Sequence, residues 1–482
     1  MKEKEIGKIS RHSVYIIFTR LTVALLSFLI IAFLTRNLGP ENYGIFSYVL
    51  SISGVLFSFS FLGLDAYLRR DLPYYLGRQK LGTIRQVLVS VLFWSSLISF
   101  GLSLVLVVAS RFLLYPNFIL YSIPYFIFFT LFSFAALSLS ALRKFGSNAI
   151  AEISNRVLAL LFLFIFIGLA VTGAILSYML AFLGSTLISF FILKRNLKNF
   201  KVKIISIRKL LNGFSLSYFG SGVVSTVFFY TNIFFLTYFS FSFGIKEVGY
   251  YALALNIAAF LSEFLSFVPN AVEPAILEYY GRSDRKEVQN LFNFSTKYTL
   301  LFSFPIMLSI IFASDIFVIT FFKESFANTI PMLSIIALSI IPFVLSKLLA
   351  PLVLAKKVTK YFFQLNLLRL ILVLIFSAFL IPIFGGIGAA ISYVLSFVAG
   401  LIYFIKKILV ETKIKIDTSV VSKELVVSLI FVLLLFIPRN LIYVLIGGIA
   451  LFIAYLIILY KLRIIEKEEL RMILGNIKLK RT

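Results

Sequence analysis

The sequence contains no cysteine and a single histidine, His12, among its 482 residues. Without cysteine the chain has no means of forming a disulfide framework, a thiolate metal site or a thiol redox centre. One histidine with no cysteine beside it also excludes a cluster of the nitrogen and sulfur ligands that hold transition metals. We therefore expect no metal and no cofactor.

Acidic residues are scarce, since 20 Asp and Glu stand against 46 Lys and Arg, which gives a net charge of +26. Charged residues make up 14% of the chain, whereas 61% of it is hydrophobic, with a mean hydropathy of +1.03. A soluble protein could not cover so much apolar surface with so few charges. The sequence also lacks a G-x-x-x-x-G-K-[ST] phosphate loop and any large loop for chemistry, so we do not expect an enzyme.

Apolar runs of about 20 residues, the length that crosses the hydrocarbon core of a bilayer, recur from one end of the chain to the other. Because the runs are continuous and not alternating, they indicate helices and not the strands of a barrel. The sequence predicts an all-α polytopic membrane protein of about fourteen transmembrane helices. The predicted segments are Val14–Leu34, Gly44–Leu64, Val87–Ala109, Phe118–Leu142, Ala149–Ala170, Gly173–Leu193, Phe214–Phe239, Val248–Val268, Phe292–Ala313, Thr329–Leu354, Tyr361–Ile381, Gly386–Ile405, Leu425–Ile437 and Leu441–Tyr460.

Basic residues alternate between the loops that this count defines. The two termini and the even-numbered loops hold 37 of the 46 Lys and Arg residues, and the odd-numbered loops hold five. Positive charge is retained on the cytoplasmic side, so both termini and the basic loops are predicted to be cytoplasmic, in a plasma membrane. The spread of these cations over eight segments favours anionic membrane lipids as partners and argues against nucleic acid.

Two stretches of the chain resemble each other at a nearly constant displacement. Leu38–Gly44 matches Phe243–Gly249 with a shift of 205 residues, and Tyr74–Arg78 matches Glu278–Arg282 with a shift of 204 at the glycine. Six helices per copy give both copies the same orientation in the membrane. The predicted organisation is an N-terminal six-helix lobe (1–193), a basic cytoplasmic linker (194–211), a second six-helix lobe (212–410), and two appended helices with a basic tail (411–482).

Three cations within the predicted helices are candidates for binding an anionic group. An ionisable residue at membrane depth is costly and usually faces a protein interior or an aqueous cavity. Arg20 lies about a third of the way into the first segment, and Arg369 lies similarly deep in the eleventh. Lys347 lies nearer the cytoplasmic end of the tenth, where its long side chain could reach the interface. For each cation the alternative is a structural pairing within the protein.

Two carboxylates are candidates for binding a coupling proton or sodium ion. Asp65 ends the second segment, and Glu263 lies near the cytoplasmic end of the eighth. Carboxylates at such depths often couple secondary transport, although a solvated carboxylate at the interface is the simpler interpretation. In the fifth segment, Glu152 and Arg156 are spaced to form an i, i+4 ion pair.

The stretch A-F-L-T-R-N-L-G-P-E-N-Y-G-I-F-S-Y (Ala32–Tyr48) and its continuation Phe61–Arg78 resemble the polysaccharide-biosynthesis flippases. These belong to the O-antigen flippase-like branch of the multidrug/oligosaccharidyl-lipid/polysaccharide exporter superfamily. The resemblance implies alternating-access translocation of a polyprenyl-diphosphate-linked oligosaccharide without ATP, with Arg20 in a cationic central cavity. Glycan-assembly enzymes would then be further partners.

Two other functions compete with this one. A multidrug or organic-cation antiporter of the same superfamily would need acidic residues at depth, whereas the deepest charges here are Arg20, Arg156 and Arg369. A non-transporting scaffold that recruits glycan-assembly enzymes would tolerate the loss of Arg20.

Overall fold

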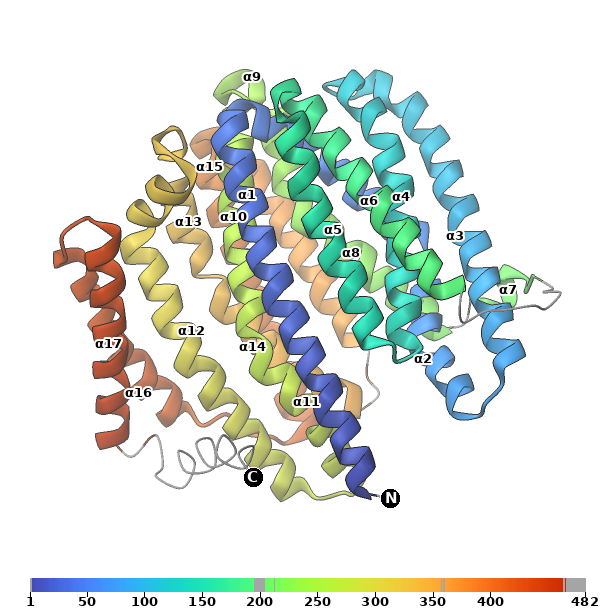
Figure 1. Cartoon of the computed structure of the whole chain (residues 1–482). Coiled ribbons are helices and arrows are strands. Elements are labelled where there is room, and N and C mark those ends of the chain that lie inside the picture. Colours follow the sequence, from blue (N-terminus) through green and yellow to red (C-terminus); the bar gives the residue numbers. More distant parts are fainter. Residues whose placement is uncertain are drawn as a thin grey trace. The chain divides into compact units, whose positions relative to one another are not determined.

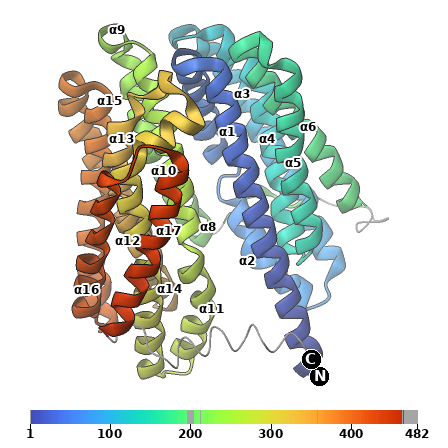
Figure 2. The ribbon, with the colours of Figure 1, turned by 60° about the vertical axis from the view of Figure 1, so that its left-hand side comes forward.

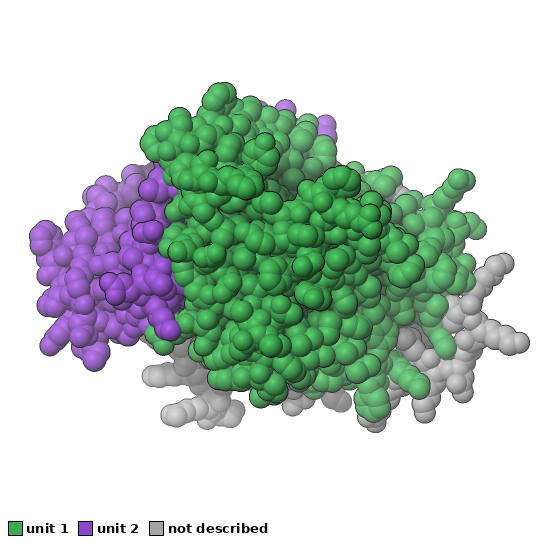
Figure 3. Space-filling model, turned by 90° about the horizontal axis from the view of Figure 1, so that it is seen from above, with its two compact units in different colours: residues 1–252, 362–386 green, residues 253–361, 387–482 purple. Residues whose placement is uncertain are grey.

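The computed structural model describes residues 2–194, 204–211, 213–356, 358, 360–462 and 464, and all the regular structure in them is helical (Figure 1). The predicted linker is described only at its two ends, and the predicted basic tail lies almost wholly outside the described residues. The chain forms two compact units, coloured separately in Figure 3. Unit 1 comprises residues 1–252 and 362–386, and unit 2 comprises residues 253–361 and 387–482.

Helices α10 and α15 run through both units. Unit 1 also contains α1 (Lys2–Ser60), α2 (Leu64–Gly77), α3 (Leu81–Ala109), α4 (Pro116–Ala141), α5 (Phe145–Phe166), α6 (Ala170–Lys194), α7 (Ile207–Leu210), α8 (Gly213–Tyr238) and α9 (Ser240–Phe243). Unit 2 also contains α11 (Phe267–Gly281), α12 (Arg285–Phe322), α13 (Thr329–Ala337), α14 (Ile340–Ala355), α16 (Thr418–Ser428) and α17 (Leu441–Lys461). The shared helices are α10 (Lys246–Leu265) and α15 (Lys360–Thr412). Short 3₁₀ helices lie at Ser110–Phe112, Ile167–Leu169, Glu324–Phe326 and Leu429–Phe436.

Eleven helical stretches of the described chain are long and apolar enough to cross a membrane. Three of them have 42, 50 and 53 residues, about twice the length that one crossing requires. Each of these three is interrupted by a residue with positive φ, at Gly39, Ala170 and Gly385. The eleven stretches therefore contain fourteen segments, and the all-α, fourteen-helix prediction is confirmed. The thirteenth begins earlier than predicted, at Thr418.

Large apolar side chains project outward from several helices. On α3 the exposed residues Leu97, Phe100 and Leu104 follow one another at helical spacing, with half or more of each side chain accessible. α17 likewise exposes Ile442, Ile446 and Ile449. A continuous apolar face of this length would be unfavourable in water and is stable against lipid tails.

Helices α4, α5 and α6 pack side by side in unit 1 (Figures 1 and 2). Aromatic rings fill the space between them, with 5.5 Å between the ring centroids of Tyr125 and Phe182 and 5.0 Å between those of Phe129 and Phe182. Helix association in lipid depends on such close packing, because lipid tails are as apolar as the side chains themselves.

The internal repeat is visible in the backbone. Gly39 (φ 69°, ψ 172°) and Gly244 (φ 82°, ψ 150°) are 205 residues apart, and each breaks the helical path just before a new helical segment. Ala170 (φ 51°, ψ −128°) and Gly385 (φ 55°, ψ −130°) form a second matched pair at the later junctions. The same unusual backbone conformations thus recur at corresponding joints of the two copies.

The two copies also meet at corresponding residues within unit 1. A Cβ atom built on Gly44 would collide with the carbonyl oxygen of Ile245, and one on Gly249 would collide with the carbonyl oxygen of Pro40. Pro40 and Ile245 are themselves 205 residues apart, so the two collisions are reciprocal. The motif that identifies the repeat in the sequence is therefore a glycine-to-backbone contact between its copies.

The units are defined by packing, whereas the lobes 1–193 and 212–410 are predicted from the repeat. Unit 1 contains segments from both copies, because α8 packs against α1 and α2, and the first part of α15 hydrogen-bonds to α8. The boundaries predicted at 193, 211 and 410 remain a prediction.

We predict that Gly44→Ala and Gly249→Ala each lower the stability of the protein by about 1–3 kcal/mol, because the added methyl group has no space beside backbone atoms. Thermal unfolding of the purified variants in detergent measures the effect. Gly101→Ala on α3 is the matched control, since nothing lies within 4 Å of a Cβ added there. Equal unfolding temperatures for all three variants would contradict the close contact.

Candidate functional site

Arg20 lies on α1 of unit 1, and its side chain is exposed. Leu21, Leu25 and Leu29, the next exposed large apolar residues of α1, lie on other faces of the helix. Arg20 makes no hydrogen bond or ion pair with the residues that the structure describes. It is therefore an exposed cation on an apolar helix, with no counter-charge in the described protein.

Arg156 on α5 is a second deep cation of unit 1. It lies close enough to the buried hydroxyls of Tyr125 and Tyr178 to act on them electrostatically. The expected i, i+4 pair with Glu152 is wrong: the Glu152 carboxylate instead accepts a hydrogen bond from the Asn148 amide at 2.8 Å, and Arg156 forms no ion pair within the described chain. Asn148 lies one turn before Glu152, so an equally spaced amide took the place of the cation.

Arg369 lies on α15 in the interior of unit 1, where only 6% of it is accessible. The same face of α15 carries Asn366 and Ser377, three residues before and eight residues after it. The Asn366 amide donates to the Ser221 hydroxyl at 3.1 Å, and the Ser377 hydroxyl donates to Asn232 at 2.5 Å. Arg369 thus lies on the face of α15 that hydrogen-bonds to α8, and its burial there favours the structural alternative for this residue.

Lys347 and Glu263, predicted for two different roles, lie together in unit 2. The Lys347 ammonium lies 3.5 Å from the Glu263 carboxylate and 5.3 Å from the ring centroid of Phe343. A second carboxylate, that of Glu273 on α11, is also influenced by this ammonium. Burial raises the pKa of Glu273 above its ordinary value, and the charge of Lys347 opposes that shift. In the sequence, Glu273 follows the predicted eighth segment, where a cytoplasmic gate region or simply a loop is expected.

Asp65 lies in the first turn of α2, two residues after the left-handed residue Gly63. Burial raises the pKa of its carboxyl above the ordinary value, and the charge of Arg69, one turn further along, opposes the shift. Asp65 and Arg69 both act electrostatically on the hydroxyl of Tyr218 on α8. The i, i+4 spacing of Asp65 and Arg69 was the signal in the sequence that could have indicated this pairing.

The structure therefore brings Lys347 and Glu263 together and gives Asp65 a basic neighbour, while Arg20 and Arg156 lack acidic partners in the described chain. Among the described residues, no three His, Cys, Asp or Glu side chains lie close enough to hold a metal ion.

Residues 9–280 match the family model described as polysaccharide biosynthesis protein. The chain belongs to this family. A second model, described as MatE, matches residues 222–380. Curated protein sequences provide no match.

Solved structures share the fold of this polysaccharide biosynthesis protein over most of its length. A structure titled lipid II flippase MurJ, in an inward closed conformation, matches with a TM-score of 0.75 at 17% identity, covering 94% of this chain and 99% of that one. An inward-facing multidrug resistance MATE transporter of the MOP superfamily matches with a TM-score of 0.64 at 15% identity, covering 82% of this chain and 99% of that one. A MOP superfamily transporter from Pyrococcus furiosus, described by the reverse polarity of its binding pocket, matches with a TM-score of 0.53 at 14% identity. The match covers 82% of this chain and 96% of that one. The protein is a multi-pass membrane protein with the flippase and transporter fold of that superfamily.

We predict that Arg369→Ala destabilises the protein by about 3–5 kcal/mol, because it removes a buried charged partner and leaves a cavity. Arg20→Ala should leave the unfolding temperature nearly unchanged, since surface changes away from specific contacts usually stay within about 0.5 kcal/mol. Thermal unfolding of both purified variants provides the comparison. A stability loss for Arg20→Ala as large as that for Arg369→Ala would show that Arg20 is structural.

A carboxyl whose pKa is raised in the folded state binds its proton more tightly there, so its contribution to stability is present at low pH. That contribution is lost as the pH rises through the folded-state pKa. We predict that Asp65→Asn flattens this part of the pH dependence of the unfolding temperature and leaves the protein as stable as the native chain, or more stable, at neutral pH. Asp71→Asn, which removes a partly buried carboxylate paired with Arg70 at 2.9 Å, is the control, and the pH dependence should remain in it. A lower unfolding temperature at neutral pH in Asp65→Asn, but not in Asp71→Asn, would contradict the raised pKa assigned to Asp65.

Proposed function

We propose that the protein is a flippase that moves a polyprenyl-diphosphate-linked oligosaccharide, a precursor of a polysaccharide or glycan, across the plasma membrane. The observation that carries the proposal is that two deep arginines of unit 1 have no acidic partner in the described chain. Arg20 is exposed, and neither it nor Arg156 has an acidic partner among the described residues. A cation that the protein does not neutralise at membrane depth is costly unless a ligand supplies the opposite charge.

The diphosphate of such a lipid carries the charge that these cations lack. An arginine guanidinium binds phosphate oxygens through two parallel hydrogen bonds, which makes it well suited to this group. Tyr178, beside Arg156 and only partly buried, can offer an apolar ring and a hydroxyl to a sugar, whereas the ring of Tyr125 packs against Phe182 in the core. Membership of the polysaccharide biosynthesis protein family supports the same substrate class.

The repeat supports an alternating-access mechanism. Two copies with the same orientation, joined at matched glycines, provide two similar bodies whose relative movement can open a site to either side of the membrane. The proposal needs no ATP hydrolysis. Both termini and the basic loops are proposed to lie in the cytoplasm, and glycan-assembly enzymes are proposed as neighbours that supply or consume the lipid-linked glycan.

Asp65 and Glu263 remain the candidates for a coupling proton or sodium ion. Each has a nearby cation, Arg69 for Asp65 and Lys347 for Glu263. Protonation of the carboxylate would release that cation. Because Lys347 is already paired, we assign it to this switch in preference to the headgroup site, and Arg369 to a structural role.

An organic-cation antiporter is the second candidate, and it would require carboxylates whose charge is available to the ligand. The two candidate carboxylates have basic neighbours, whereas Arg20 and Arg156 have no acidic ones in the described chain. The balance of available charge therefore favours an anionic substrate.

We predict that Arg20→Ala reduces export about 10- to 100-fold, because one hydrogen-bonded contact to a charged group contributes about 1.5–3 kcal/mol. Cells that lack this protein, complemented with the variant, should lose surface glycan and accumulate the lipid-linked oligosaccharide on the inner side. Arg20→Lys should retain part of the export. Arg111→Ala removes an exposed arginine on the predicted outer side and is the matched control.

Equal membrane levels of all three variants, measured by immunoblot, are required for the comparison. Normal export by Arg20→Ala would remove Arg20 from the site. Resistance to organic cations that depends on the protein, with unchanged surface glycan, would favour the antiporter.

A further inference from the structure

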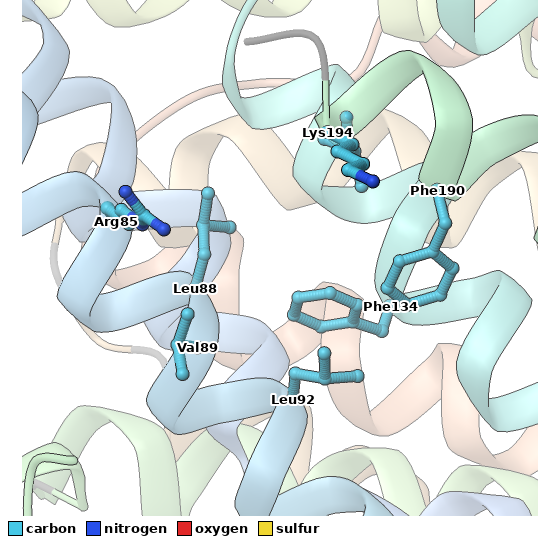
Figure 4. Close-up of a pocket in the computed structure, with 8 residues that line it drawn as sticks. Arg85, Leu88, Val89, Leu92, Phe134, Phe190 and Lys194 are labelled. Carbon is cyan, nitrogen blue, oxygen red and sulfur yellow. The ribbon is translucent and has the colours of Figure 1, made fainter. Parts of the chain in front are cut away.

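A pocket of about 200 Å³ in unit 1 lies apart from the residues assigned above. One wall comes from α3, where Arg85, Leu88, Val89 and Leu92 follow one another on a single helix face. The other walls come from Phe134 on α4 and from Phe190, Leu193 and Lys194 at the end of α6. Figure 4 shows the two cations on opposite sides of one end of the pocket, with the leucines and phenylalanines beyond them.

The lining of the pocket divides into two chemical parts. Leu88 and Leu193 are almost fully buried, and the rings of Phe134 and Phe190 stack with 6.2 Å between their centroids. These side chains provide an apolar slot with fixed walls. Arg85 and Lys194 are the only charged residues that line the described pocket, and no acidic side chain accompanies them there. The site therefore combines an apolar slot with a divided positive charge at its end.

The pocket also lies at a defined depth. Arg85 is in the first turns of α3, and Lys194 is the last residue of α6, so both lie at the ends of helices that lead into predicted cytoplasmic loops. Beside the pocket, the Trp94 indole donates to the carbonyl oxygen of Ile205 at 2.9 Å, and the Ile205 amide donates to the Ser90 hydroxyl at 2.8 Å. Tryptophan is typical of the membrane interface. The cations are thus at headgroup level, and the slot extends toward the hydrocarbon.

We infer that this pocket binds one anionic phospholipid of the cytoplasmic leaflet, with its phosphate between Arg85 and Lys194 and part of one acyl chain between the leucines and phenylalanines. The volume supports a partly enclosed lipid, because sites that enclose a whole small molecule usually measure about 300–1,000 Å³. The charge of the site complements the anionic lipids that are enriched on the cytoplasmic side. Bound there, the lipid bridges the ends of α3 and α6.

The inference rests on the predicted topology and does not depend on the proposed flippase activity. It differs from a general attraction of the basic protein to anionic membranes, since it requires two particular cations and an apolar slot. That difference determines the experiment.

Native mass spectrometry of the delipidated full-length protein, titrated with palmitoyl-oleoyl phosphatidylglycerol, measures binding directly. The double variant Arg85→Gln/Lys194→Gln should weaken the tightest phosphatidylglycerol site about 10- to 30-fold, since each cation near the membrane surface contributes about one kcal/mol of attraction. Phosphatidylcholine with the same chains should bind weakly to both proteins. The control Lys356→Gln/Lys406→Gln removes two exposed cations of unit 2, the same change in charge, and should alter binding less than twofold.

A second variant, Val89→Trp, fills the slot without changing charge and should also weaken phosphatidylglycerol binding. It gives an independent result if the double variant does not fold, which size-exclusion chromatography would reveal. Equal losses in the two charge variants would overturn the inference in favour of diffuse attraction. Unchanged phosphatidylglycerol binding in Val89→Trp would show that the slot holds no acyl chain. If binding of a polyprenyl phosphate required Arg85 and Lys194 while binding of phosphatidylglycerol did not, the pocket would belong to a different lipid.

Discussion

Charge that must remain within hydrocarbon is the constraint on which the functional architecture depends. Water is absent there, so each ionised side chain needs a partner in the protein, a path to the interface or a ligand. Arg369 has the first solution, since it is buried and interacts within the protein on the face of α15 that hydrogen-bonds to α8. Lys347 has it as well, through Glu263. Arg20 and Arg156 have no acidic partner in the described chain, so the same physical rule that stabilises the fold identifies these two as positions where an anionic ligand would be stabilised.

On the basis of this division we propose two cationic sites with different tasks. The cations of the proposed substrate site lie within transmembrane segments, where binding of a diphosphate changes the local energy most. Arg85 and Lys194 lie at helix ends, where a phospholipid phosphate is already at the right depth. A flippase that handles one lipid phosphate must also avoid retaining others in its transport path. Separate sites at separate depths allow a bulk phospholipid to stabilise the structure without occupying the substrate site.

The sequence was sufficient for the helical class, the number of segments and the repeat, because span length, charge alternation and the paired glycine motifs are local signals. It could not predict which deep charges were compensated. Lys347 and Glu263 are 84 positions apart in the chain, and no local pattern connects them; the same holds for Arg156 and Tyr125, which come from different helices. Glu152 shows that local patterns can also be ambiguous. Asn148 and Arg156 both lie four residues from it, and the sequence did not indicate that Asn148 would be its partner. The pocket between α3, α4 and α6 depends on the packing of three helices, which no single stretch of sequence encodes.

The reciprocal contacts of Pro40 with Gly249 and of Ile245 with Gly44 have the form of an isologous interface, in which residue i meets residue j and j meets i. Such reciprocity is the signature of two identical subunits around a two-fold axis. The chain thus contains, inside one polypeptide, a contact with the geometry of a symmetric dimer of two copies. The symmetry does not extend to the deep cation Arg20, whose counterpart 205 residues along the chain is Ser225, so one symmetric joint holds together two copies with different chemistry.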